Sequence, residues 1–494
     1  GAGNLFRGFI ARLQQRLLEN GAADCGILAA EGYDPAILED IYVPYDSLSL
    51  LVGLRPDGET EREVIASIAD GLHADSSNPA EWARLCAVFR QPSLQLASFT
   101  ITEKGYALRD MGGGLTAAAQ ADIAAGPAGV RHAMGIAAAL LLERYRAGGA
   151  SLAMVSLDNC SRNGERLREA VLEIARGWVS AGLAEPGFPD WLADEARVAF
   201  PFSMIDKITP RPAEEVAQAL TRLGVADMTP VITDRHTVIA PFVNAELPEY
   251  LVIEDRFPNG RPPLEQAGVY LTDRATVIAA ERMKVTACLN PLHTALAVFG
   301  CLLGYRSIAE EMADTELRAL VTRLGYDEGL PVAPDPGILR PADFLREVIE
   351  QRLPNRFLPD TPQRIAADTS QKLPIRFGET LRTWLADDRL DAESLVGIPL
   401  VFAGWLRYLL GLDDAGQPMA LSPDPLLEEL REQLEGIRPG EPDSADGRLR
   451  TLLSNAALFG TDLYAAGLGD RVEGLFREML EGPGAVRKTL RRRL

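Results

Sequence analysis

Three polar side chains of different chemistry lie close together in the segment Glu281–His293, ERMKVTACLNPLH. Lys284 carries an ammonium, Asn290 a side-chain amide and His293 an imidazole. Such groups can transfer a proton and donate hydrogen bonds to an oxygen that gains negative charge. Because Pro291 favours the first turn of a helix and asparagine is a preferred N-cap, we predict that Asn290 caps a new helix and that Lys284 lies on the segment leading into it. The alternative is a helix cap, a surface lysine and a structural histidine without chemistry.

The first residues, GAGNLFRGF, have the spacing of a phosphate-binding glycine turn. Gly1 and Gly3 fill the first two glycine positions of the pattern G-x-G-x-x-G, where glycine permits a tight turn and a close approach of backbone to a pyrophosphate. Phe6 stands at the third position. The strand expected before the turn is not in the sequence, and the chain begins at Gly1 without a methionine, so whether an N-terminal piece is missing stays open. Asn4 and Arg7 are further candidates for cofactor contacts.

A helix and a buried strand are predicted to follow the glycine turn. Apolar residues recur with helical spacing from Phe9 to Leu17, and the run Cys25–Ala30, CGILAA, has the character of a parallel strand. Glu31 follows this strand. An acid at this position could bind the ribose hydroxyls of a dinucleotide and repel the extra phosphate of NADP, or it could be a solvated loop residue.

Polar residues also follow other predicted strands of the first half. Ligands of a doubly wound sheet bind at the carboxyl ends of its strands, so these residues are candidates for the cofactor and substrate sites. Asp206, in the segment FPFSMIDKITP, could orient a cofactor or a catalytic side chain, or it could pair with Lys207. The candidates are Thr102, Glu103, Asp158, Asn159 and Asp206.

Strands and helices alternate as far as about residue 275, and the pattern is helical from there onward. Alternation of this kind is typical of an α/β sheet. We therefore predict a Rossmann-type, doubly wound N-terminal domain over residues 1–275, which binds NAD. A mostly α-helical domain over residues 276–494 is predicted to bind substrate and carry the catalytic groups.

Composition excludes several classes of function. The 494 residues carry a formal net charge of −20, which disfavours nucleic acid as a partner. We see no apolar run of membrane-spanning length and no signal peptide. The five cysteines are widely spaced and odd in number, as expected for reduced, mostly buried thiols in a cytoplasmic protein. The four histidines lack metal-ligand spacing, so no metal is expected.

Five segments, in order, resemble the polyol-specific long-chain dehydrogenases, the mannitol dehydrogenase family. They include SLDNCSRNG, FPFSMIDKITP, LVIEDRFPNGRPPLEQAG and RIAADTSQK. The remaining segment, Glu281–His293, is similar to the family pattern Lys-x4-Asn-x2-His. Here five residues rather than four separate Lys284 from Asn290. We therefore expect either a one-residue bulge or a displaced lysine.

The resemblance implies a metal-independent dehydrogenase that uses NAD to interconvert a sugar acid or polyol and its keto form by hydride transfer. D-mannonate and D-fructuronate are the expected pair, with mannitol 2-dehydrogenase or tagaturonate reductase activity as alternatives. A catalytically impaired dinucleotide-binding protein is the alternative from another class, motivated by Phe6, the missing strand and the shifted Lys284. We expect a cytoplasmic monomer or small homo-oligomer that acts on a small molecule, away from membranes.

The resemblance also implies roles for individual residues. Lys284 is expected to be the general acid/base, which requires burial or neighbouring cations to lower its pKa from about 10.4. Asn159 and Asn290 are expected to donate hydrogen bonds to the reacting oxygen. Substrate is expected to contact His293, Arg364 and Lys372, and the last two also supply the positive charge that an acidic substrate needs. Arg376 would also suit a carboxylate; Arg364 and Lys372 occur in polyol enzymes as well, so they do not decide between the two substrate classes. The expected cofactor contacts are Gly1, Gly3, Asn4, Arg7, Glu31, Thr102, Glu103, Asp158 and Asp206.

Overall fold

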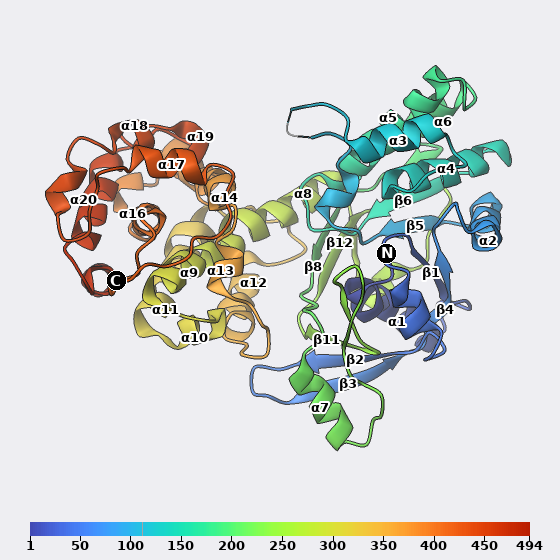
Figure 1. The fold of residues 1–494 in the computed structure, drawn as a ribbon, viewed down its shortest axis with the longest axis horizontal. Helices are drawn as coiled ribbons and strands as arrows, with labels where there is room; N and C mark the ends of the chain where they lie inside the picture. Colours follow the sequence, from blue (N-terminus) through green and yellow to red (C-terminus); the bar gives the residue numbers. More distant parts are fainter. Residues whose placement is uncertain (111) are drawn as a thin grey trace. The chain divides into compact units, whose positions relative to one another are not determined.

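The chain folds into two compact units, shown in a computed structural model that describes residues 1–110 and 112–494. The first unit comprises Gly1–Arg55 and Glu59–Ile278, and the second comprises Pro56–Gly58 and Ala279–Leu494. Among the described residues every strand belongs to the first unit, whereas the second contains helices only (Figure 1).

The strands of the first unit form several short ladders. β5, β6 and β7 are parallel, as are β1 and β4, and β2 pairs in parallel with β11. Parallel pairing requires crossover connections, which the helices between these strands provide. The strands are β1 (Ile27–Glu31), β2 (Ser49–Leu54), β3 (Thr60–Ile65), β4 (Ile68–His73), β5 (Leu96–Phe99), β6 (Leu152–Ser156), β7 (Val198–Ala199), β8 (Ser203–Asp206), β9 (Val231–Ile232), β10 (Val238–Ile239), β11 (Phe242–Glu246), β12 (Tyr250–Glu254) and β13 (Tyr270–Thr272).

Helices of the first unit pack against these ladders around two apolar clusters. One cluster is centred on the completely buried Trp178, and the other surrounds Phe9 at the start of the chain. The helices, with π and 3-10 turns marked η, are η1 (Phe6–Ile10), α1 (Ala11–Glu19), η2 (Ile37–Tyr42), α2 (Pro79–Arg90), η3 (Glu103–Tyr106), α3 (Ala117–Ala125), α4 (Ala133–Arg146), α5 (Asn163–Ser180), α6 (Phe188–Ala193), α7 (Glu214–Arg222), η4 (Leu264–Ala267) and α8 (Arg274–Arg282).

The second unit is built around two apolar helices, α9 and α16, that pack directly on each other. Gly404 of α16 makes this possible, because a Cβ atom there would lie 2.5 Å from the ring of Phe299 on α9. The helices are η5 (Met283–Cys288), α9 (Asn290–Leu303), α10 (Ile308–Ala313), α11 (Thr315–Thr322), η6 (Arg323–Gly329), η7 (Leu330–Val332), α12 (Pro341–Glu347), η8 (Val348–Arg352), α13 (Pro362–Ile365), α14 (Thr369–Arg376), α15 (Gly378–Ala386), η9 (Ala392–Ser394), α16 (Gly397–Leu409), α17 (Leu427–Gln433), η10 (Pro442–Ala445), α18 (Arg450–Leu453), α19 (Ala456–Phe459), α20 (Gly469–Met479) and α21 (Ala485–Arg493).

One helical stretch, Arg274–Leu303, is long and apolar enough to cross a membrane by length and composition alone. Its most apolar window is 83 % buried inside the protein, which is typical of a core helix. The cysteines are all free thiols, and Cys86, Cys288 and Cys301 are buried, whereas Cys25 is exposed. Burial raises the pKa of Cys288 and of Cys301 to about 12, so these two thiols are unreactive at neutral pH.

Candidate functional site

A cavity of about 1000 Å³ lies in the first unit and reaches the glycine turn. Gly1 and Gly3 line it, and so do Glu31 at the end of β1 and Thr102 after β5. Glu31 and Thr102 come from the carboxyl ends of parallel strands, where ligands of doubly wound sheets bind, and the two glycines belong to the turn at the start of the chain. The cavity is therefore the candidate cofactor site.

The glycine turn has the space that a bound phosphate requires. A Cβ atom on Gly1 would lie 2.5 Å from the carbonyl oxygen of Thr100, whereas the corresponding space beside Gly3 is open to 4 Å. Phe6 occupies the third glycine position and lines the cavity. Gly8 instead allows the close packing of helix on strand, because its Cβ atom would lie 2.7 Å from Val243 of β11. The departure at Phe6 thus leaves the function of the third glycine intact.

Glu31 is buried and holds the glycine turn in place. Its Oε2 accepts a hydrogen bond of 2.8 Å from the backbone N–H of Ala2. Its Oε1 accepts from the N–H groups of Tyr33, at 2.8 Å, and Asp34, at 3.1 Å. The interpretation of Glu31 as a solvated loop residue is wrong, because the strand end and the turn fold over its carboxylate.

Asn4 and Arg7, two predicted cofactor contacts, lie behind the turn and not on the cavity wall. Arg7 is buried, and its guanidinium donates to the carbonyl oxygen of Ala240 at 2.9 Å and to Asn4 Oδ1 at 2.9 Å. The Asn4 amide donates to the carbonyl of Pro210 at 3.3 Å. Both side chains therefore connect the glycine turn to distant loops, and a direct contact with a cofactor stays a prediction for each of them.

Asp158 connects the loop after β6 with the loop after β5. Its carboxylate accepts hydrogen bonds of 2.9 Å from the N–H groups of Ile101 and Thr102, and a third from the hydroxyl of Tyr106. Thr102 has a positive φ of 67°, a conformation that these bonds hold.

Glu103 points to solvent and pairs with Arg166 at 2.7 Å, so it is a poor candidate for cofactor binding. Asn159, next to Asp158, is exposed.

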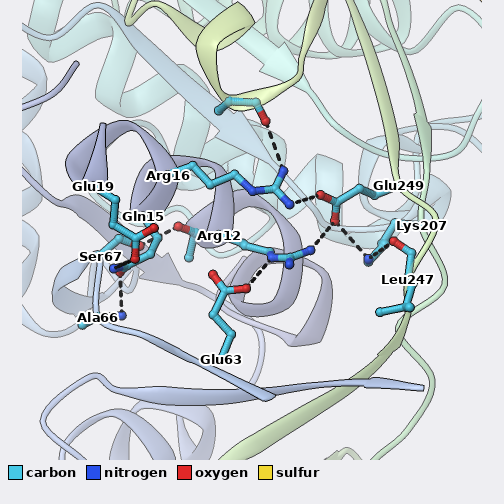
Figure 2. A network of polar contacts seen from close by, with 12 residues as sticks. Arg12, Gln15, Arg16, Glu19, Glu63, Ala66, Ser67, Lys207, Leu247 and Glu249 are labelled. Atoms are coloured by element: carbon cyan, nitrogen blue, oxygen red, sulfur yellow. Dashed lines mark hydrogen bonds and ion pairs between the residues drawn. The ribbon is translucent and has the colours of Figure 1, made fainter. Parts of the chain in front are cut away.

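Two further motif residues secure the strand ends. Asn163 is buried; its amide donates to Ser203 Oγ at 2.9 Å, and its Oδ1 accepts from the Ser203 N–H at 3.0 Å. It therefore ties the β6 loop to β8, at whose end Asp206 is buried. Lys207, which the sequence left as a possible partner for Asp206, forms its ion pair with Glu249 at 3.0 Å (Figure 2).

In the second unit, the segment around Lys284 is a π turn. The backbone N–H of Leu289 donates to the carbonyl of Lys284, five residues earlier, at 3.1 Å. A π turn holds one more residue than an α turn, so it absorbs the extra residue between Lys284 and Asn290. The expected one-residue bulge is therefore present. The Lys284 side chain is 1 % exposed and contacts the protein interior.

The predicted capping role of Asn290 is wrong. Leu289 occupies the N-cap position, with φ −130° and ψ −62°, and Asn290 is the first residue of α9. The preceding π turn brings the chain into α9 without a polar cap, and Pro291 fits the first turn because its missing N–H would have no partner there. The Asn290 side-chain amide consequently has no hydrogen-bond partner within the described part of the chain and is free to meet a ligand.

His293 and Arg364, both predicted substrate contacts, meet through an acid that the sequence did not single out. His293 Nε2 lies 3.0 Å from Asp360 Oδ2, at an angle that does not make a good hydrogen bond. Asp360 Oδ1 is in ion-pair contact with Arg364. Burial raises the pKa of Asp360, but the contacts with His293 and Arg364 outweigh it and leave that pKa below its usual value. Asp360 is therefore an anion between two site residues.

Lys372 and Arg376 lie one turn apart on α14. Lys372 Nζ donates to the carbonyl of Ile365 at 2.9 Å and to that of Ala367. Arg376 donates to Thr294 Oγ1 at 2.6 Å, one turn of α9 beyond Asn290. The second unit thus contains Lys284, Asn290, His293, Arg364 and Lys372 with two residues that sequence reasoning missed, Thr294 and Asp360. It also contains Arg376, which the sequence suggested as suited to a carboxylate. The position of Asp360, four residues before Arg364, was the available signal for that pair.

Within the described residues, no three or more His, Cys, Asp or Glu side chains are placed to hold a metal ion. The candidate chemistry of the second unit rests instead on an amine, an amide and an imidazole.

Comparison with known proteins identifies the family. The sequence model described as the mannitol dehydrogenase Rossmann domain matches residues 1–266, and that of the mannitol dehydrogenase C-terminal domain matches residues 277–476. The chain belongs to the mannitol dehydrogenase family. It is 54 % identical to D-mannonate oxidoreductase of Thermotoga maritima over 99 % of this chain and 90 % of that protein. It is 31 % identical to mannitol 2-dehydrogenase of Pyrenophora tritici-repentis over 97 % and 79 % of the two chains.

Solved structures in this family have the same fold. Substrate-free D-sorbitol dehydrogenase superposes with a TM-score of 0.81 at 27 % identity, covering 99 % of this chain and 93 % of that one. Mannitol 2-dehydrogenase of Pseudomonas fluorescens, in a ternary complex with NAD and D-mannitol, gives 0.71 at 28 % identity, with coverage of 100 % and 92 %. The predicted family, the Rossmann-type and helical fold, and the oxidoreductase class are confirmed.

Proposed function

We propose that this oxidoreductase uses NAD to interconvert D-mannonate and D-fructuronate. The observation that supports the sugar acid is the identity of 54 % to D-mannonate oxidoreductase over nearly the whole chain, against 31 % to a mannitol 2-dehydrogenase. We assign the cofactor to residues 1–275 and the substrate and proton-transfer groups to residues 276–494. The protein is expected to work in the cytoplasm as a monomer or small homo-oligomer, which light scattering can test.

The first unit has a cavity that suits a dinucleotide. The open space beside Gly3 and the close backbone contact at Gly1 are the features that phosphate binding requires. Glu31 lines the same cavity and places a carboxylate where ribose hydroxyls would be recognised and an additional phosphate repelled. NAD bound there would supply the acceptor for the hydride.

The second unit supplies the groups for proton transfer. Lys284 would take the hydroxyl proton of the secondary alcohol during oxidation and return it during reduction. The unpaired amide of Asn290 would donate a hydrogen bond to the reacting oxygen. Loss of one such donor typically costs about 2.7–4 kcal/mol of transition-state stabilisation. His293, fixed by Asp360, would hold a neighbouring substrate hydroxyl.

The test compares NADH formation with D-mannonate and with D-mannitol, in wild type and in Lys284→Met. Wild type should prefer D-mannonate, and the variant should lose roughly 10²- to 10⁴-fold in kcat while binding NADH normally. Lys488→Met, which removes an exposed lysine paired with Glu481, is the matched control. A clear preference for mannitol would favour the mannitol 2-dehydrogenase alternative. NADH binding without turnover of any sugar acid or polyol would favour the catalytically impaired alternative.

A further inference from the structure

Arg376 is a partly buried cation without an anionic partner. Its guanidinium donates to Thr294 Oγ1 at 2.6 Å and to the carbonyl of Asn290 at 3.5 Å, and both partners are neutral. Across residues 1–110 and 112–494 it forms no ion pair, and burial lowers its pKa to about 10. Its remaining N–H groups are not sealed in the interior, so they can reach a ligand.

Two other cations of the second unit, Arg364 and Lys372, already have partners within the protein. Arg364 is exposed and neutralised by Asp360. Lys372 gives hydrogen bonds to the carbonyls of Ile365 and Ala367, and burial, followed by the charge of Arg376, lowers its pKa to about 8. Asp368 and Asp424 oppose that shift, and Asp424 also accepts hydrogen bonds from the N–H and hydroxyl of Ser370. Among the described residues neither acid forms an ion pair with Arg376, so its guanidinium has no direct counter-charge.

A partly buried guanidinium that meets only neutral protein groups leaves its charge unpaired, and an anionic ligand would supply the missing counter-charge. The planar fork of arginine matches a carboxylate, to which it donates two parallel hydrogen bonds. Thr294 directly follows His293, and Asn290 lies one helical turn earlier on α9. An anion on Arg376 would therefore lie beside the side chains assigned to the reacting alcohol.

We propose that Arg376, oriented by Thr294, binds the carboxylate of the sugar-acid substrate and sets the preference for sugar acids over polyols. This inference rests on the proposed function, because it names the group that recognises the acid in that same site. Lys372 adds positive charge to the site. Arg364 has an indirect role, because it pairs with Asp360, which in turn contacts His293.

The test measures kcat/KM for D-mannonate and D-mannitol in Arg376→Met, Arg376→Lys and Thr294→Val. Arg376→Met should raise the KM for D-mannonate roughly 10- to 100-fold, the range expected for a lost charged hydrogen bond, and leave mannitol nearly unchanged. Arg376→Lys keeps the charge but not the fork and should recover part of the loss, and Thr294→Val should show a smaller loss of the same kind. Arg318→Met, an exposed arginine on α11, controls for the change in net charge.

Equal losses for both substrates would show that Arg376 only supports the fold, and an unchanged KM for D-mannonate would equally overturn the proposal. If wild type turns over neither substrate, the proposed function fails, and calorimetric titration of D-mannonate into the protein with NADH decides the present inference separately. If D-mannonate binds wild type and binds Arg376→Met more weakly, the proposed role of Arg376 is supported. If D-mannonate binds both equally, or does not bind, that role is refuted. Thermal melting establishes whether each variant is folded. If Arg376→Met does not fold, the comparison of the two substrates is made with Arg376→Lys.

Discussion

Asp360 lies between His293 and Arg364, with its Oδ2 3.0 Å from His293 Nε2 and its Oδ1 against the Arg364 guanidinium. The side chain of Asp360 is 14 % exposed, whereas that of Arg364 is 66 % exposed. The acid is therefore the inner member of the group, and it contacts the imidazole directly. Arg364, expected to bind substrate, is better described as a residue that fixes Asp360.

Asp360→Asn should reduce kcat/KM for D-mannonate by roughly 10- to 100-fold, because the variant no longer holds His293 with a charged group. NADH affinity, measured by fluorescence titration, should not change. Asp388→Asn, an exposed acid on the same unit, is the matched control and should retain full activity. A variant as active as wild type would show that His293 does not need Asp360.

Glu31→Gln should weaken NAD binding and reduce the discrimination against NADP. Both oxygens of Glu31 accept backbone N–H bonds, and an amide nitrogen in place of one of them would face an N–H group. A lost bond of this kind costs about 1–3 kcal/mol, so the KM for NAD should rise roughly tenfold or more. Initial rates with NAD and with NADP provide the measurement, with the exposed Glu169→Gln as control. An unchanged NAD-to-NADP ratio would remove Glu31 from cofactor recognition.

Glu311 should make the protein less stable as pH rises. It is completely buried against Gly300 of α9, neither carboxylate oxygen has a hydrogen-bond partner, and burial raises its pKa to about 9. Between pH 4.5 and about 9 the folded state therefore retains a proton that the unfolded state releases, so stability falls through this window and levels off above it.

Glu311→Gln removes this titration. The variant and wild type should unfold at similar urea concentrations near pH 4.5, and by pH 9 the variant should be more stable by roughly a few kcal/mol. Glu350→Gln, at an exposed position, should show no such pH dependence. Parallel unfolding curves at both pH values would mean that Glu311 finds a partner in solution.

Glu249 should be important for the stability of the first unit. Its carboxylate forms ion pairs with Arg12 at 3.1 Å, Arg16 at 2.6 Å and Lys207 at 3.0 Å (Figure 2). These pairs join α1 to the segment before β12. Glu249→Gln would leave three cations around a neutral group and should destabilise the protein by about 3 kcal/mol. Glu63→Gln removes only one partner of Arg12 and should cost less than about 1 kcal/mol. Thermal unfolding of both variants compares them; equal losses would contradict this view of Glu249.

Features that depend on local spacing could be predicted from the order of the residues alone. The glycine turn at Gly1 and Gly3, the strand that ends at Glu31 and the alternation of strands and helices all follow from periodicity and turn chemistry over a few residues. Comparison of Glu281–His293 with the family pattern also showed one extra residue between Lys284 and Asn290. It therefore predicted either a one-residue bulge or a displaced lysine.

How the extra residue between Lys284 and Asn290 is accommodated, and which side chains surround it, became visible only in the folded protein. The π turn after Lys284 removed the capping role predicted for Asn290, and Gly8 took the packing role expected of a glycine at Phe6. The contact between His293 and Asp360 and the uncompensated charge of Arg376 arise from segments dozens of residues apart in the sequence. Burial and pairing are properties of the packed chain, so no local pattern of residue types could fix them.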